Sequence, residues 1–349
     1  MRRAALEVQH LRRDLPFTPG AGPNGGDWFL PWRQLQLAFA ERGVALHTPD
    51  VHAGQPQAFE LHLNAQRGAG AVPSYVFIYE DPLVRPLNDD RALLARYRKV
   101  FTWHLGQLAE LRNAVRLDYP NTLQPRRTPG FAGRDLHCVM LASNKALMKP
   151  DARSLHERRI ATIRAFERLA PQRFALYGQG WDIQAVRPGL AGRALKRVHE
   201  WVSRVAPGRR PFPSWQGKAL RKTDVLDRAR FAITYENSRG SPGYLTEKLF
   251  DCLASACVPV YIGSPGWQQV VPADCCIDGD RFADPAQLVA YLETITAAQF
   301  EALQAAGRAF LEDPQTARFS HDHFCRVIVQ TVMDDLPASD AGALRNPDG

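Results

Sequence analysis

The chain has 349 residues, of which 45% are hydrophobic and 23% charged, and its formal net charge is +8. This composition is typical of a soluble globular protein, and the length predicts two domains of roughly 150 residues each. The sequence contains no run of about 18 uncharged apolar residues, and its start lacks the apolar core and small-residue cleavage site of a signal peptide, so we expect neither a membrane-spanning helix nor a signal peptide.

The first third of the chain alternates helical and extended patterns. Residues 28–42 carry apolar side chains at helical spacing, and Gly43 ends this helix. Strands are predicted at residues 44–50, 74–79 and 100–103. Because alternating strands and helices indicate a parallel sheet covered on both faces, we predict an N-terminal Rossmann-like domain over residues 1–128.

A second α/β unit follows the Pro- and Gly-rich segment 121–133, which is interpreted as a linker. We predict this C-terminal Rossmann-like domain over residues 129–330 and a frayed tail over 331–349. Its predicted elements are strands at 137–142, 174–181, 230–235 and 258–262, with helices at 155–169 and 284–295.

The charge is concentrated in one stretch, since twelve Lys or Arg and only three acidic residues lie from Arg187 to Arg230. Nucleic-acid binding is one interpretation, but no nucleic-acid-binding module accompanies the stretch. A nearby polyanionic small ligand or an anionic membrane surface explains it equally, and we expect no nucleic-acid partner. Six cysteines without a CxxC pair favour buried thiols in a reducing compartment, and hence a cytoplasmic protein.

The most informative segment is RFAITYENSRGSPGYLTEKLFDCLASACVPVYIG, residues 230–263. It predicts a buried strand, a glycine-containing turn, a helix and a second buried strand. Its polar residues gather where the strand ends and the helix begins, the place where open α/β sheets bind phosphorylated ligands. These residues are Glu236, Asn237, Tyr244, Glu247 and Lys248.

This segment resembles the signature of the α1,3/4-fucosyltransferases, glycosyltransferase family 10. In that family a strand ends in Glu-Asn, Tyr-x-Thr-Glu-Lys begins a helix, and a Val/Ile-Pro-Val strand follows. The stretches VFIYEDP, FTWH, LASN and LYGQGW extend the similarity more weakly along the chain. The resemblance implies the GT-B architecture, in which two Rossmann-like domains face each other across a cleft, and GDP-fucose-dependent fucosyltransferase activity.

The polar residues of the segment suit a nucleotide-sugar donor. Lys248, in the first turn of a helix, can stabilise the charge of a leaving diphosphate, and Tyr244 can donate to the same phosphates. The Glu247 carboxylate suits the ribose hydroxyls, as the resemblance also implies. Capping explains a Thr-Glu-Lys helix start equally well, but it does not explain Tyr244 or the Glu236-Asn237 pair.

The resemblance also implies an arginine against the donor β-phosphate, and Arg159 fits the family pattern best. Arg158 and Arg153 lie close enough to leave the register open, and a solvated arginine-rich helix face is the alternative. Weaker donor-side candidates are Asn144, Lys218 and Lys222.

Glu80 is the candidate catalytic base. It follows a predicted buried strand, which would deliver it to the carboxyl edge of the N-terminal sheet, and the resemblance implies the same role. If it is the base, burial should raise its pKa toward neutrality. A strand-terminating Glu-Asp-Pro turn is the alternative.

The sequence Asp278-Gly279-Asp280 has the DxD spacing of some metal-dependent transferases, but turn chemistry explains it, and we expect no required metal or cofactor. The resulting hypothesis is an inverting transfer of L-fucose from GDP-fucose to a galactoside or N-acetylglucosaminide glycan acceptor, in lipopolysaccharide or surface-glycan synthesis. A cytoplasmic location, with peripheral association at the inner face of the membrane, fits that role. The rivals are a transferase that uses another nucleotide sugar and a non-catalytic nucleotide- or nucleic-acid-binding protein.

Overall fold

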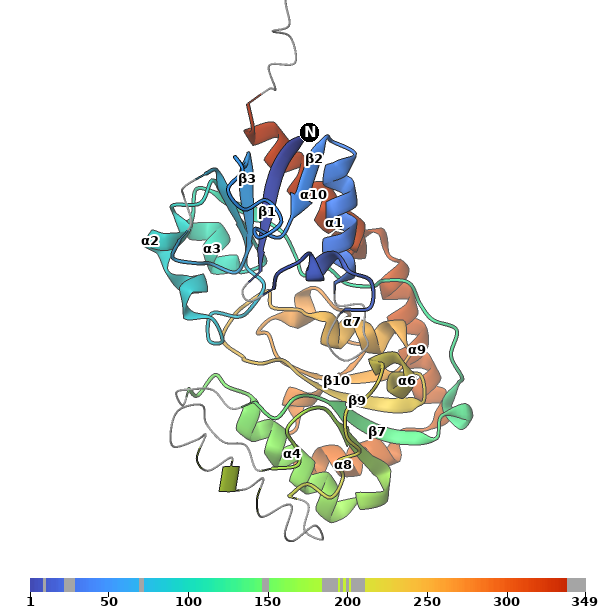
Figure 1. Cartoon of the computed structure of the whole chain (residues 1–349). Helices are drawn as coiled ribbons and strands as arrows, with labels where there is room; N and C mark the ends of the chain where they lie inside the picture. The colour runs from blue at the N-terminus through green and yellow to red at the C-terminus, as the bar shows by residue number, and fades with distance from the viewer. Residues whose placement is uncertain are drawn as a thin grey trace, which may run out of the picture.

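The computed structural model describes residues 1–8, 11–21, 29–68, 72–145, 151–183, 194, 197–198, 201 and 211–337. Within these ranges the chain forms two α/β domains, each built on a sheet of parallel strands, as the sequence predicts (Figure 1). Much of the basic stretch that begins at Arg187 lies outside the described residues.

The N-terminal sheet has the strand order β2-β1-β3-β4-β5-β6. The predicted strands near residues 44, 74 and 100 are confirmed, whereas the sequence patterns missed β1, β3 and β6. Strands β1 and β3 carry charged or polar residues that mask their buried centres, and β6 has only three residues. The strands are β1 Arg2–Val8, β2 Val44–His47, β3 Phe59–Leu63, β4 Ser74–Phe77, β5 Lys99–Thr102 and β6 Ala114–Arg116.

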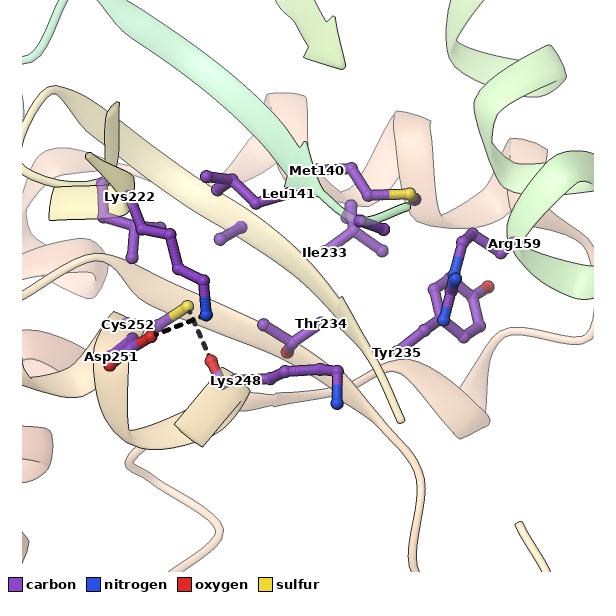
Figure 2. A pocket seen from close by; sticks show the side chains of 13 residues that line it. Met140, Leu141, Arg159, Lys222, Ile233, Thr234, Tyr235, Lys248, Asp251 and Cys252 are labelled. Atoms are coloured by element: carbon purple, nitrogen blue, oxygen red, sulfur yellow. Dashed lines mark hydrogen bonds and ion pairs between the residues drawn. The ribbon is translucent and has the colours of Figure 1, made fainter. Parts of the chain in front are cut away.

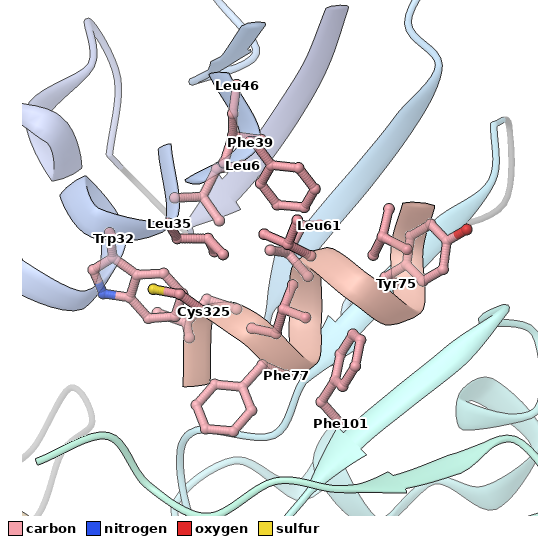
Figure 3. Packing of buried hydrophobic residues seen from close by; sticks show 14 of the residues in the cluster. Leu6, Trp32, Leu35, Phe39, Leu46, Leu61, Tyr75, Phe77, Phe101 and Cys325 are labelled. Carbon is pink, nitrogen blue, oxygen red and sulfur yellow. The ribbon is translucent and has the colours of Figure 1, made fainter. Parts of the chain in front are cut away.

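Side chains alternate between the two faces of this sheet, as the period of a strand requires. Tyr75 and Phe77 of β4 face the larger cluster, which contains side chains of α1 (Leu30–Ala40) and α10 (His321–Asp335) (Figure 3). Val76 faces the smaller cluster beside α2 (Arg91–Leu94). Helix α3 (Leu105–Glu110) follows β5. The sheet is therefore covered on both faces.

Helix α10 corrects the predicted end of the domain. The prediction of a frayed tail from residue 331 is wrong for residues 331–335, which continue this helix. Val332 is fully buried in the core of the N-terminal domain, and the Asp335 carboxylate accepts hydrogen bonds from Tyr75 Oη (2.6 Å) and Arg98 Nε (2.8 Å). Burial and these bonds hold the helix end in place. Residues 321–330, predicted in the C-terminal domain, pack with the N-terminal one, and residues 338–349 lie outside the described ranges.

The C-terminal sheet has the strand order β11-β10-β9-β7-β8. Its strands are β7 Leu136–Leu141, β8 Phe174–Tyr177, β9 Ala229–Tyr235, β10 Val258–Ile262 and β11 Ile277–Asp278. Its helices are α4 His156–Leu169, α6 Lys222–Leu226, α7 Glu247–Ala254, α8 Pro285–Thr294 and α9 Ala297–Glu312.

Strand β8 is shorter than the predicted 174–181 because Gly178 has a φ of +139° and lies against β7. A Cβ atom at this position would be 1.8 Å from the Ala142 carbonyl oxygen. Only glycine fits such a close backbone approach in this conformation. The chain therefore turns away from the sheet at the carboxyl end of β8.

Two segments connect the domains. The first contains the predicted linker 121–133, and the second lies between α9 and α10, where they form a parallel bridge at Asn121 and Ser320. Arg126 ties the first segment to the C-terminal domain through an ion pair with Asp227 (2.6 Å). The six cysteines are free and buried. In the described ranges no helix is long and apolar enough to cross a lipid bilayer.

Candidate active site

The candidate site is built at the carboxyl ends of β7 and β9 and at the start of α7. Thr246 is the N-cap of α7, and its hydroxyl accepts a hydrogen bond from the Lys248 backbone N–H (3.4 Å). The positive end of this helix therefore opens beside the end of the central strand β9. The turn between them is fixed by Gly243, whose φ is +96° and whose Cβ, if present, would be 2.5 Å from the Trp103 carbonyl oxygen of the N-terminal domain.

The buried carboxylate of Glu236 organises this helix start. Glu236 is 0% exposed and accepts hydrogen bonds from the Thr246 hydroxyl (2.9 and 3.0 Å) and the Thr246 N–H (3.1 Å). It also pairs with the Lys248 ammonium at 2.8 Å. Because Glu236 is completely buried, it can act on a ligand only through these partners. The sequence suggested a direct contact between Glu236 and the donor. The structure instead indicates that Glu236 positions Thr246 and Lys248.

Lys248 combines a buried anchor with an accessible head. Its side chain is 22% exposed, and its ammonium also lies 3.2 Å from the Thr246 hydroxyl. Burial acts against the charged form, but the carboxylates of Glu236 and then Glu247 outweigh it and raise the pKa of Lys248. The ammonium is therefore fixed, charged and close to the N–H groups of the helix, as a phosphate-binding residue requires.

The three candidate arginines differ in their partners. Arg158 forms an ion pair with Asp280 (2.5 Å) and donates to the carbonyls of Gly279 and Phe282, so its guanidinium is fully engaged. Arg153 is exposed and pairs with the nearby Asp151 (2.7 Å). Neither guanidinium is available for a phosphate without losing these bonds.

Arg159 is buried without a carboxylate partner. It is 6% exposed and makes only long hydrogen bonds of 3.4 Å to the backbone carbonyls of Ser143 and Glu236, while its Nε has no partner. No carboxylate in the described ranges lies within ion-pair distance of it, and burial lowers its pKa to about 10. A buried cation without a counterion favours an anion at that position. Of the three arginines, Arg159 has the surroundings expected of a phosphate ligand.

Glu247 belongs to an ion-pair group that the sequence did not reveal. The ammonium of Lys222 lies 3.5 Å from a carboxylate oxygen of Glu247 and 3.3 Å from one of Asp251. Burial would raise the pKa of Glu247, but Lys222 and then Lys248 lower it to about 2. Burial raises the pKa of Asp251. Asp251 was not predicted, although its position four residues after Glu247 places both on one helix face.

Of these charged residues, Arg159, Lys222, Lys248 and Asp251 line a pocket between the sheet and α7 (Figure 2). Its floor is apolar, and the polar side chains of Arg159, Lys222 and Lys248 approach it from three different helices. An apolar floor with a few converging charged groups is typical of a ligand site. The lining residues are Met140, Leu141, Ala142, Arg159, Lys222, Leu226, Ala232, Ile233, Thr234, Tyr235, Lys248, Asp251 and Cys252.

Tyr244 joins the two domains. It is 3% exposed, and its ring packs at 4.6 Å against Trp103 of the N-terminal domain. Burial raises the pKa of its hydroxyl well above the usual value, so the hydroxyl keeps its proton. The packing accounts for an aromatic residue here, and a contact between its hydroxyl and phosphate stays a prediction.

The remaining donor-side candidates occupy three different settings. The Asn144 side chain braces the loop after β8 by donating to the carbonyls of Gly180 (2.8 Å) and Ile183 (3.0 Å). Asn237 is half-buried at the end of β9, and Lys218 is exposed. The structure brings Asn237 to the site, places Asn144 in a structural contact and leaves Lys218 at the surface.

Glu80 lies at the carboxyl edge of the opposite sheet, beyond the end of β4. Its backbone N–H donates to Asn64 Oδ1 (2.7 Å), and its carbonyl accepts from Asn88 Nδ2 (2.7 Å). Asn64 adopts a φ of +66°, a conformation in which asparagine is enriched, and its side chain also accepts from Asn88. These two asparagines, which the sequence patterns did not single out, hold the Glu80 backbone in place.

The environment of the Glu80 carboxylate differs from that of the donor-side acids. Burial raises the pKa of Glu80. Two charges of the other domain also act on this carboxylate: that of Lys248 lowers its pKa, and that of Glu247 raises it. No described group donates a hydrogen bond to this carboxylate. The expectation of a raised pKa agrees with this setting, and Glu80 faces the donor-side helix start.

Both carboxylates of the DxD sequence already make contacts within the protein. Asp278 accepts from the Asp280 backbone N–H (2.9 Å), and Asp280 pairs with Arg158 and Arg239. In the described part of the chain no cluster of three or more His, Cys, Asp or Glu side chains could hold a metal ion. These two carboxylates therefore act as a turn cap and an arginine partner.

Comparisons with known proteins agree with this arrangement. Residues 208–304 match the family model described as glycosyltransferase family 10 (fucosyltransferase) C-term. Over 71 residues the chain is 38% identical to an α-(1,4)-fucosyltransferase of Arabidopsis thaliana, a match that covers 20% of this chain and 18% of that relative's length.

Two solved structures share the fold over nearly the whole chain. One is an α1,3-fucosyltransferase with GDP-fucose, which superposes with a TM-score of 0.51 at 12% identity over 97% of this chain and 90% of that one. The other is HepE of Anabaena in complex with UDP and glucose, with a TM-score of 0.54 at 12% identity over 96% and 100%. The chain thus has the GT-B fold, and its residues 208–304 are similar to the C-terminal part of glycosyltransferase family 10, the fucosyltransferase family.

Proposed function

We propose that the protein is an inverting glycosyltransferase that moves L-fucose from GDP-β-L-fucose to a hydroxyl of a galactoside or N-acetylglucosaminide glycan, in α1,3 or α1,4 linkage. The proposal rests mainly on what surrounds the segment that matches the family-10 model. Lys248 of that segment lines a pocket together with Arg159, a buried cation without a carboxylate partner in the described ranges.

The proposed reaction follows from the charges on the two facing edges. The acceptor oxygen bonds to the anomeric carbon while the bond from that carbon to the β-phosphate oxygen breaks, and Glu80 takes the acceptor proton. The electron pair leaves with GDP, whose growing negative charge is stabilised by Lys248, Arg159 and the free N–H groups of α7. Attack from the face opposite the diphosphate turns the β-linked donor into an α-fucoside.

Glu247 completes the proposed donor site by binding the ribose hydroxyls. We propose that the basic groups take the place that a divalent metal has in other transferases, because Asp278 and Asp280 are already committed. We also propose a cytoplasmic location with peripheral membrane association and a role in lipopolysaccharide or surface-glycan synthesis. No nucleic-acid partner is proposed.

A second candidate function keeps the fold and changes the donor. The structural similarity to HepE with UDP and glucose favours a UDP-sugar as the alternative. The ribose and diphosphate are common to both donors, so the groups around Lys248 and Glu247 serve either one. A nucleotide-binding protein without transfer activity is the third possibility.

A donor panel separates these functions. The protein is incubated with GDP-fucose, GDP-mannose, UDP-glucose or UDP-galactose, each with and without a set of galactoside and N-acetylglucosaminide acceptors. We expect acceptor-dependent release of GDP from GDP-fucose alone, with an α-fucoside identified by NMR. Release from a UDP-sugar alone would replace the donor, and nucleotide binding without release would favour the non-catalytic alternative.

A further inference from the structure

We infer that Lys222 is a positioning residue that holds the Glu247 carboxylate in place for the ribose of the donor nucleotide. The inference rests on the proposed function only for the role of Glu247. It assigns Lys222 a task other than direct contact with the donor, and it makes Asp251 the second anchor of its ammonium.

The first support is the geometry of the ion-pair group. The Lys222 ammonium lies between two carboxylates of one helix, 3.5 Å from Glu247 Oε1 and 3.3 Å from Asp251 Oδ2. Residues four apart share one face of a helix, and like charges there repel each other. A cation between them removes this repulsion and fixes the direction of both side chains.

The second support is the rigidity of the element that carries Lys222. Helix α6 packs on α7, because the buried side chains of Val225 and Leu226 lie in the same cluster as Cys252 of α7. The backbone at Lys222 is thus fixed relative to Glu247. Figure 2 shows the Lys222 ammonium extended toward Asp251, on the side of the pocket opposite Arg159.

The third support is accessibility. The side chains of Glu247 and Asp251 are 28% and 29% exposed, and Lys222 and Asp251 both line the pocket that contains Lys248. The ion-pair group is therefore partly covered but open to a ligand. Lys222 also contributes to keeping the pKa of Glu247 at about 2, so Glu247 is a charged acceptor over the whole physiological range. A charged carboxylate is the form that accepts hydrogen bonds from two hydroxyls.

The test measures whether Lys222 acts through the ribose. Binding of GDP and of 2′-deoxy-GDP is measured by calorimetry for the wild-type protein, Lys222→Met, Lys222→Arg and Lys218→Met. Lys218 is the matched control, since it is an exposed lysine four residues before Lys222 and outside helix α6. In the wild-type protein the lost hydroxyl should weaken binding about tenfold, the size of one charge-assisted hydrogen bond.

Lys222→Met should weaken GDP binding about tenfold and reduce the preference for GDP over 2′-deoxy-GDP toward one. Lys222→Arg should restore part of that preference, Lys218→Met should keep it, and kcat of Lys222→Met should stay within about threefold of wild type. If Lys222→Met is unfolded at the assay temperature, Asp251→Asn is used, with a smaller loss of preference expected.

A preference unchanged in Lys222→Met, or absent from the wild-type protein, would overturn the inference. UDP and 2′-deoxy-UDP are measured in parallel because they carry the same ribose. Binding of UDP instead of GDP would reject the proposed donor and leave the test of Lys222 intact.

Discussion

The carboxyl edges of the two sheets, which face each other, differ in how their charged side chains are paired. At the donor-side edge, Lys248 is anchored by Glu236, and Lys222 is shared by Glu247 and Asp251. At the acceptor-side edge, Glu80 has a fixed backbone but no described hydrogen-bond donor to its carboxylate. One edge is a network of paired charges, whereas the Glu80 carboxylate on the other edge has no described partner.

This difference matches the two tasks of the proposed reaction. Stabilising a leaving diphosphate requires positive groups that are charged and oriented before the substrate arrives, which paired carboxylates provide. Accepting a proton near neutral pH requires a carboxylate whose pKa is raised, which burial without a fixed partner provides. Ion pairing at Glu80 would lower its pKa and make it a weaker base.

The largest expected effect is that of Glu80→Gln. Replacing the base should lower kcat by about 10³-fold, because general-base catalysis contributes roughly 10²–10⁴. The affinity for GDP, measured by calorimetry, should stay within about twofold because Glu80 lies on the opposite domain. A kcat close to that of the wild-type protein would show that Glu80 is not the base, and the proposed functional difference between the two edges would then be wrong.

The pH dependence of the reaction reports the same residue. Glu80 acts as a base when it is deprotonated, and burial raises its pKa, so kcat/KM should fall as the pH drops through that raised value. The acidic limb of the profile should therefore lie above the usual glutamate pKa of about 4.3. Glu247 should add no limb in this range, because its pKa is about 2. A profile flat down to the usual glutamate range would contradict the assignment.

The next effect tests the two neighbouring arginines of α4. Arg159→Ala should weaken GDP binding about 100-fold, the equivalent of one or two charge-assisted hydrogen bonds to phosphate. Arg158→Ala should lower the melting temperature by breaking its bonds to the loop around Asp280, with GDP affinity changed less than threefold. Equal effects of both changes on affinity would place Arg158 in the donor site as well.

A change at Glu236 tests whether the donor-side edge depends on the buried carboxylate that holds the Lys248 ammonium. Glu236→Gln breaks a buried pair and should lower the free energy of unfolding by roughly 3–5 kcal/mol, measured by urea denaturation. GDP affinity of the folded variant should fall about tenfold or less, because the Lys248 charge remains but is no longer held in place. A fully stable variant would show that the pairing with Lys248 contributes little.

The smallest effect on activity is expected for Tyr244→Phe, a change at a residue that lies between the two edges. Tyr244→Phe keeps the packing against Trp103 but removes the hydroxyl predicted to donate to phosphate, so GDP affinity should fall by up to about tenfold while kcat stays within about threefold. Tyr244→Ala removes a buried aromatic side chain and should destabilise the protein by about 3–5 kcal/mol. An unchanged GDP affinity in Tyr244→Phe would contradict the predicted hydrogen bond to phosphate.

Local patterns were sufficient for much of the fold and for one half of the site. Hydrophobic periodicity located three of the six strands of the N-terminal sheet and four of the five strands of the C-terminal sheet, and the position of polar residues after β9 pointed to α7 and Lys248. Strands β1 and β3 were missed because their polar residues hide the buried centre. Helix α10 was not predicted, although Phe324, Ile328 and Val332 recur at helical spacing; that this face packs on the N-terminal domain is decided by tertiary contacts.

The sequence by itself determined the two parallel-sheet domains, the segment 230–263 as a candidate site and the strand end that presents Glu80. These depend on short-range periodicity and on residue types that are adjacent in the chain. Only the tertiary structure decided which charged groups are already paired: Arg158 with Asp280, Glu236 with Lys248, and Lys222 with Glu247 and Asp251. The reason is physical, since an ion pair depends on distance and burial, and the partners of Arg158 and Lys222 lie 122 and 25 to 29 residues away along the chain.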